Sequence, residues 1–127
     1  MNKTILAVGA VLGGTAVGLG ALGAHSLESL LEPEALASFK TATDYQMYHA
    51  LFLLLLGVVG LQDSDKRWIF RLVFWGVLCF SGSIYVLTLG PVMGLDPGFL
   101  FWVTPLGGIL LLAGWGLFLY RVLRSLA

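Results

Sequence analysis

The chain has 127 residues, of which 58% are hydrophobic and only 11% are charged, and its mean hydropathy is +0.93. Soluble domains carry roughly 25% charged residues, so this composition excludes an ordinary soluble protein and favours one embedded in a lipid bilayer. The formal net charge is zero, which leaves no basic field to hold nucleic acid. The length predicts a single transmembrane domain over residues 1–127.

The first two apolar stretches predict membrane-spanning helices, because each is near the ~20 residues that cross the hydrocarbon core. The first covers residues 4–24 and contains no charge. It imitates a secretory signal, but it is long enough to remain as a span in the mature protein. The second covers residues 44–61 and follows Thr43, which forms a capping box with Gln46.

Two further spans are predicted in the second half of the chain. The third covers residues 68–89 and ends at the helix-breaking pair Gly90-Pro91. The fourth covers residues 105–123, with Thr104 suited to the N-cap position and Pro105 to the first helical position.

A short amphipathic helix is predicted at residues 33–42, because Pro33 suits a helix start and apolar residues recur there at helical spacing. It either lies on the membrane surface or continues into the second span. The expected fold is therefore all-α, an integral membrane four-helix antiparallel bundle with a short interfacial helix between spans 1 and 2.

The basic residues predict the orientation of this bundle. With four spans, six of the seven Lys and Arg residues share one side with both termini, and only Lys40 lies opposite. Positive residues in short loops stay in the cytoplasm. We therefore expect a multi-pass protein of the bacterial inner (plasma) membrane with cytoplasmic N- and C-termini.

Small residues in the first span predict close helix packing. Gly9 and Gly13 have the G-x-x-x-G spacing, as do Gly14 and Gly18. Lipid provides no hydrophobic drive for helix association, so close backbone contact must supply part of it. We expect the first helix to be tightly packed, within one subunit rather than between subunits.

Polar residues gather at the predicted outer ends of the spans. The candidate cluster consists of His25, Tyr45, Gln46, His49, Ser81, Tyr85 and Thr104. One interpretation is an outward-facing pocket in which two imidazoles act as ligands or proton carriers. The other, which we favour, is a hydrogen-bonded network that locks the bundle. Two histidines alone make a weak metal site, so no metal or other cofactor is predicted.

Several of the same residues carry a resemblance to a known family. The segments concerned are Leu22-Gly23-Ala24-His25, Tyr45 to Leu51, Phe80 to Tyr85 and Thr104 to Gly108, followed by Ala113-Gly114-Trp115. Together they resemble the "domain of unknown function 423" family of small bacterial inner-membrane proteins. The resemblance implies about four transmembrane helices, and it assigns no catalytic residue.

The function predicted from the sequence is non-enzymatic. We expect a binding or accessory protein, acting with itself or within a larger membrane complex, whose outer cluster holds a lipid head group, an apolar molecule or a partner helix. One alternative is a membrane enzyme or redox subunit that uses His25 and His49. Another is a subunit of an oligomeric transporter, although one chain shows no polar path across the membrane.

Overall fold

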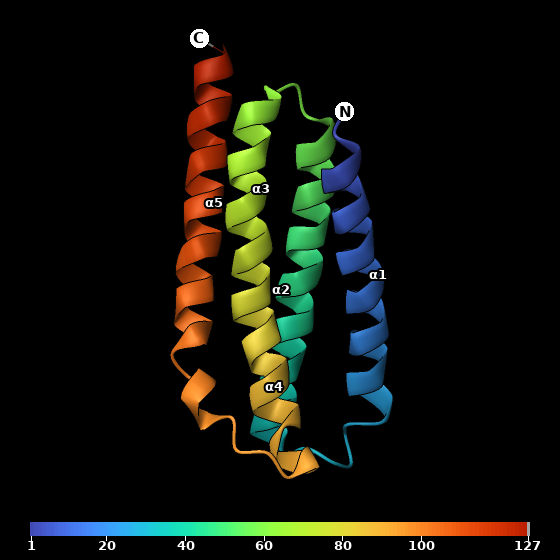
Figure 1. Cartoon of the computed structure of the whole chain (residues 1–127). Helices are drawn as coiled ribbons and strands as arrows, with labels where there is room; N and C mark the ends of the chain where they lie inside the picture. Colours follow the sequence, from blue (N-terminus) through green and yellow to red (C-terminus); the bar gives the residue numbers. More distant parts are fainter. Residues whose placement is uncertain (127) are drawn as a thin grey trace.

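The computed structural model describes residues 1–126, and every regular element in that range is helical. The elements are α1 (Lys3–His25), α2 (Pro33–Val58), α3 (Asp63–Val77), the π-helical turn η1 (Leu78–Gly82), α4 (Ser83–Leu89), the 3₁₀ turns η2 (Pro91–Met93) and η3 (Gly98–Leu100), and α5 (Val103–Leu126). Figure 1 shows the long helices side by side, with both ends of the chain at the same end of the molecule.

Three helical segments are long and apolar enough to cross a membrane. They are Lys3–His25, the continuous rod Asp63–Leu89 formed by α3, η1 and α4, and Gly98–Ser125. Helix α2 has 26 residues, but Asp44, Gln46 and His49 lower its hydropathy. The chain is therefore an all-helical protein with at least these three segments suited to lipid.

Of the two expectations for residues 33–42, the structure supports continuation into the second span, and the separate interfacial helix is wrong. That segment and the second predicted span form one helix, α2, which starts with Pro33 at its first position. Nothing in the sequence between them breaks a helix, and Lys40 pairs with Asp44 one turn later. Thr43 therefore lies inside a helix, where its hydroxyl donates to the carbonyl of Lys40, and it does not form the predicted capping box.

The other predicted boundaries shift by smaller amounts. The third rod begins at Asp63 instead of residue 68, because the charged turn before the apolar run is also helical. Helix α5 begins at Val103, so Thr104 lies within its first turn and is not an N-cap. In α1 the side chain of Asn2 caps the helix by accepting from the backbone N–H of Ile5 at 3.1 Å.

The helices pack with α2 and the α3–α4 rod in the middle and with α1 and α5 on the two sides (Figure 1). The main buried apolar cluster joins residues of all four parts, namely Ile5, Phe52, Leu53, Leu56, Ile69, Val73, Val77 and Leu111. Only 17% of the apolar window of α1 is buried, against 28% for the α3–α4 rod. Helix α1 is thus at an edge of the molecule, where it packs closely against α2.

The glycines of α1 divide between two environments. A Cβ added at Gly9 would meet the carbonyl oxygen of Ala50 at 3.1 Å, and one at Gly13 would meet the Ala50 side chain at 3.6 Å. A Cβ at Gly14 or Gly18 would meet nothing within 4 Å. The first pair therefore allows α1 to approach α2, whereas the second faces outward.

Candidate functional site

Gln46 is the centre of the polar cluster. Its side chain is buried, and its Nε2 atom donates to the carbonyl oxygen of Leu12 at 2.9 Å and to Oγ1 of Thr15 at 2.7 Å. The hydroxyl of Tyr85 donates to Oε1 of Gln46 at 2.6 Å. Because a carbonyl can only accept, the contact with Leu12 fixes which end of the amide faces α1. One side chain thus links α1, α2 and α4.

A second set of contacts in the cluster joins the π-helical turn η1 to α2. The hydroxyl of Ser81, which is 1% exposed, donates to the carbonyl oxygen of Ala42 at 2.7 Å. Next to it, the rings of Phe80 and Tyr45 stack with centroids 4.8 Å apart. A π-helical turn adds a residue to the helical repeat and changes the direction of its side chains. Here the turn places Phe80 and Ser81 against α2.

His49 is held between α2 and α5. Its Nδ1 atom lies 2.7 Å from the carbonyl oxygen of Tyr45, and the indole N–H of Trp115 donates to its Nε2 atom at 3.1 Å. The carbonyl requires a proton on Nδ1, and the indole requires a lone pair on Nε2. The imidazole is therefore neutral, in a single tautomer, with both nitrogens occupied. A metal or a proton donor could use the Nε2 lone pair only if Trp115 gave up its bond.

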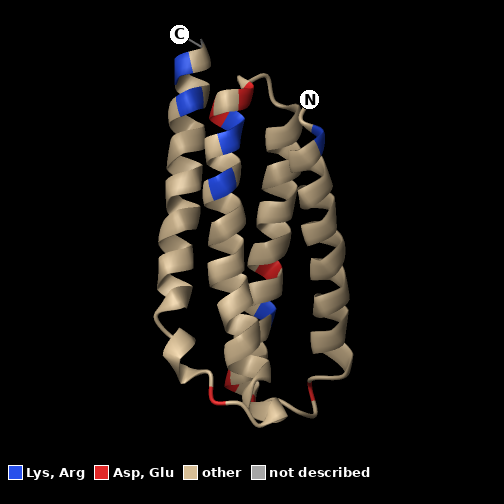
Figure 2. Ribbon diagram, viewed as in Figure 1, with Lys and Arg blue, Asp and Glu red and all other residues tan. Residues whose placement is uncertain are grey.

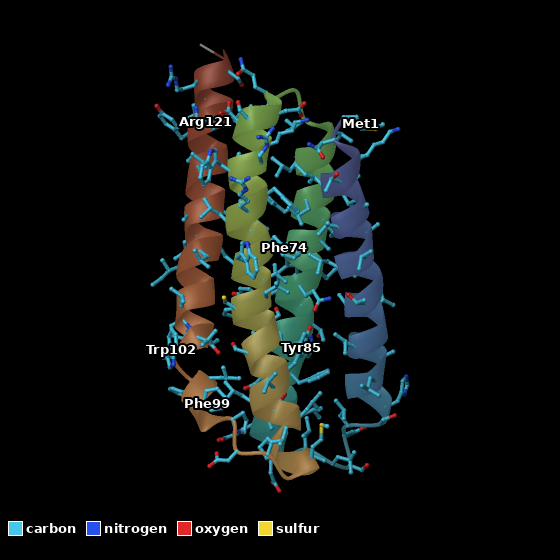
Figure 3. The ribbon with its side chains drawn as sticks, in the orientation of Figure 1. Met1, Phe74, Tyr85, Phe99, Trp102 and Arg121 are labelled. Carbon is cyan, nitrogen blue, oxygen red and sulfur yellow. The ribbon has the colours of Figure 1, made fainter. Side chains whose placement is uncertain are left out.

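Thr104 lies in the first turn of α5, beside Ser83 at the start of α4. Its hydroxyl is 2.6 Å from that of Ser83, which also donates to the carbonyl oxygen of Phe80 at 3.0 Å. This bond joins α4 to the first turn of α5. Figure 3 shows Tyr85 among the packed helices and Phe99 and Trp102 at the connection that leads into α5.

His25 is separate from the other predicted site residues. It is exposed at the last position of α1 and takes part in none of the bonds described above. Gly9 packs against Ala50, so His49 lies level with the part of α1 near Leu12. The distance from there to His25 is about 20 Å along the helix, at about 1.5 Å per residue. The structure therefore does not bring the two histidines into one site.

The depth of the cluster also differs from the expectation. Leu12 and Thr15, which bind Gln46, lie near the middle of α1, and Trp115 lies near the middle of α5. The cluster thus extends from mid-height toward the end of the molecule where α1 meets α2. The prediction placed these residues too close to the outer ends of the helices. It started the second span at residue 44, eleven residues after the first residue of α2.

Charged residues that the sequence analysis did not select line a groove between α1 and α2. The groove has a volume of about 590 Å³, and its lining includes Gly20, Gly23, Glu28, Lys40 and Asp44. The ammonium of Lys40 lies 2.9 Å from a carboxylate oxygen of Asp44, and 75% of the Lys40 side chain is exposed. The only signal in the sequence was that Lys40 is the one basic residue on its side of the predicted membrane.

Figure 2 shows why this ion pair is unusual. Basic residues gather at the end that holds both termini, and α2 carries charges between the two ends of the molecule. Gly23 packs against Phe39, so Lys40 lies level with the last turn of α1. Asp44 lies about 6 Å further along α2, toward the middle of the molecule. Both charges are therefore beside the apolar length of α1. Within residues 1–126, no three His, Cys, Asp or Glu side chains gather to hold a metal ion.

Comparisons with known proteins find a family model and relatives that are named membrane proteins. A family model described as "Protein of unknown function (DUF423)" matches residues 19–108. The UPF0382 membrane protein of Staphylococcus saprophyticus is 40% identical over 114 residues, covering 89% of this chain and 91% of its own length. A UPF0382 membrane protein of Staphylococcus aureus is also 40% identical, covering 89% of each chain. No solved structure matches the chain. The chain therefore belongs to the DUF423 family of membrane proteins, whose function is unknown.

Proposed function

We propose that the protein crosses the bacterial inner membrane four times, with both termini in the cytoplasm. Helix α2 is long enough to be the fourth span, and two of its polar residues, Gln46 and His49, are buried against neighbouring helices. The concentration of Lys and Arg at the end that holds the termini supports the orientation. Fusions of green fluorescent protein and alkaline phosphatase to each terminus test it. Fluorescent fusions at both ends are expected, and an active phosphatase at the C-terminus would contradict the proposal.

We propose further that the protein is a non-enzymatic binding protein for an amphiphilic molecule, which enters the groove between α1 and α2 from the bilayer. The observation that carries this proposal is the exposed ion pair Lys40–Asp44 beside an apolar span. Charged side chains at membrane depth are costly and usually mark functional sites. A bound head group would give these charges the polar surroundings that hydrocarbon denies them.

The chemistry of the groove favours a zwitterionic aminophospholipid, such as phosphatidylethanolamine. The Lys40 ammonium suits a phosphate, and the carboxylates of Glu28 and Asp44 suit a primary amine. The three charged side chains together carry one net negative charge, so an anionic lipid is disfavoured. Gly20, where an added Cβ would meet nothing within 4 Å, leaves room for an acyl chain beside α1.

In this proposal the cluster around Gln46 has a structural role and the groove has the binding role. Each of Gln46, His49, Ser81, Tyr85 and Thr104 already has a hydrogen-bond partner inside the protein. The separation of the two histidines gives no support to an enzyme or redox subunit that uses both, and we do not propose one. Association with a second copy or with a larger membrane complex stays a prediction.

Native mass spectrometry from mild detergent tests the binding proposal. The wild-type chain is incubated with equal amounts of phosphatidylethanolamine and phosphatidylglycerol, and the retained lipid is measured. We expect preferential retention of phosphatidylethanolamine and loss of that preference in the double variant Lys40→Gln, Asp44→Asn. Lys3→Gln, an exposed charge at the other end, is the matched control and should behave as wild type. Equal retention by the wild type and the double variant would contradict the proposal.

A further inference from the structure

A second cleft lies at the end of the molecule that holds the termini, between the start of α3 and the end of α5. Its volume is about 690 Å³. Its lining residues include Gln62, Ser64, Trp68, Arg121, Arg124 and Ser125. Most of these side chains offer hydrogen-bond donors, and two are permanently cationic. The cleft is thus unlike the α1–α2 groove, in which carboxylates outnumber the single ammonium.

The two arginines are held in place by contacts that leave part of each guanidinium group available. Nη1 of Arg121 pairs with a carboxylate oxygen of Asp65 at 3.1 Å and so ties α5 to α3. Nη1 of Arg124 donates to the hydroxyl of Tyr120 at 3.2 Å. Both guanidinium groups lie against the Tyr120 ring, at 5.6 and 5.7 Å from its centroid. These contacts restrict the two side chains before any ligand arrives, which lowers the entropy lost on binding.

The charge balance of the cleft is positive. Asp65, which pairs with Arg121, is the one carboxylate among the described residues that line it, whereas Arg121 and Arg124 supply two guanidinium groups. The Nε atom of Arg121 is buried and has no hydrogen-bond partner among the described residues. Arg71 adds a further positive charge, because its guanidinium lies 5.0 Å from the ring centroid of Trp68, which forms part of the wall.

We propose that this cleft binds a phosphate group. Guanidinium groups bind phosphate through charge-assisted hydrogen bonds, and the hydroxyls of Ser64 and Ser125 can add neutral ones. Basic pockets between transmembrane helices on the cytoplasmic side characteristically hold phosphate-bearing head groups. The exposed Trp68 is a residue type that occurs at the level of lipid head groups. The phosphate belongs either to an anionic lipid of the cytoplasmic leaflet or to a soluble phosphate compound.

The experiment uses the full-length protein in nanodiscs with phosphatidylglycerol and in neutral detergent with glycerol phosphate. Arg124→Gln is the main variant, because Arg124 makes no contact with Asp65 and its loss leaves the link between α3 and α5 intact. We expect it to weaken binding about tenfold, the effect of losing one charge-assisted hydrogen bond. Lys3→Gln, an exposed charge at the same end of the molecule, is the control and should bind as wild type.

The two arms identify the source of the phosphate. Saturable binding of phosphatidylglycerol that glycerol phosphate does not displace indicates a lipid ligand, and binding of glycerol phosphate alone indicates a soluble one. Equal losses in Arg124→Gln and Lys3→Gln would show a general effect of surface charge and overturn the proposal, as would no binding of either probe. None of these outcomes depends on the α1–α2 groove, so the two proposals can fail separately.

Discussion

Helix α2 carries two neighbouring polar regions, the residue Gln46 and the ion pair Lys40–Asp44. They differ in burial and in whether other helices supply their hydrogen-bond partners. Gln46 points inward, is 4% exposed and has partners on α1 and α4. Asp44 and Lys40 lie in a groove, and their only shared contact is the ion pair between them. The comparison teaches that polar residues in a membrane helix can serve either cohesion or recognition. Whether the protein itself satisfies their hydrogen bonds separates the two roles.

The largest expected effect concerns the interior contact between α5 and the π-helical turn. A Cβ added at Gly107 would lie 2.7 Å from the carbonyl carbon of Cys79 and 2.8 Å from Cα of Phe80. Backbone atoms cannot move aside as a side chain can, so the helices must separate. We expect Gly107→Ala to lower the free energy of unfolding by about 3 kcal/mol, measured by denaturant titration in detergent micelles.

Gly18→Ala is the matched control for this substitution, because it adds the same atoms to a glycine with nothing within 4 Å. We expect it to leave the free energy of unfolding unchanged or slightly raised, since alanine favours a helix more than glycine does. Equal destabilisation by both variants would mean that the interior and the outer face do not differ as described.

A smaller loss is expected when the centre of the polar cluster is removed. Gln46→Leu deletes three hydrogen bonds and leaves the Tyr85 hydroxyl without its acceptor. Interhelical hydrogen bonds in membrane proteins contribute on average ~0.6 kcal/mol each, so we expect a total loss of about 2 kcal/mol. Thermal unfolding in detergent, followed by circular dichroism, measures the change. An unaltered melting temperature would contradict the locking role.

The smallest change in stability is expected at the groove. Lys40 and Asp44 form an exposed ion pair one turn apart on α2, and in detergent solution, where water reaches exposed charges, such pairs contribute only ~0.5 kcal/mol to a helix. The variant Lys40→Gln should therefore unfold within about 0.5 kcal/mol of wild type. A loss as large as that of Gln46→Leu would show that the pair is structural, and the comparison between the two regions would fail.

Much of the fold could be predicted from hydropathy, because charge-free apolar runs have few other stable environments. The first span agrees with α1 to within a residue at each end. Helix α2 was divided in two because Thr43 and Gln46 fit the capping box of a helix start when read in sequence alone, and Lys40 and Asp44 lie at the same place. Their pairing within the helix became visible only in three dimensions.

The members of the polar cluster were easier to predict than their arrangement. Gln46 and Tyr85 were selected by residue type and approximate depth, and the structure joins them directly. His25 was selected by the same reasoning, but it lies at the exposed end of α1. Trp115 was missed as a cluster member because tryptophan near mid-span looks apolar, and its bond to His49 depends on how α5 packs against α2. Sequence spacing gives faces of one helix, whereas contacts between helices require the packing.

The central claim, that an internal polar lock holds α1, α2 and α4 together, is tested most directly by a double-mutant cycle between Gln46 and Tyr85. The free energy of unfolding in detergent is measured for wild type, Gln46→Leu, Tyr85→Phe and the double variant. We expect a coupling energy of about 1 kcal/mol, because the 2.6 Å hydrogen bond between these side chains can be lost only once. Strictly additive losses would contradict the account.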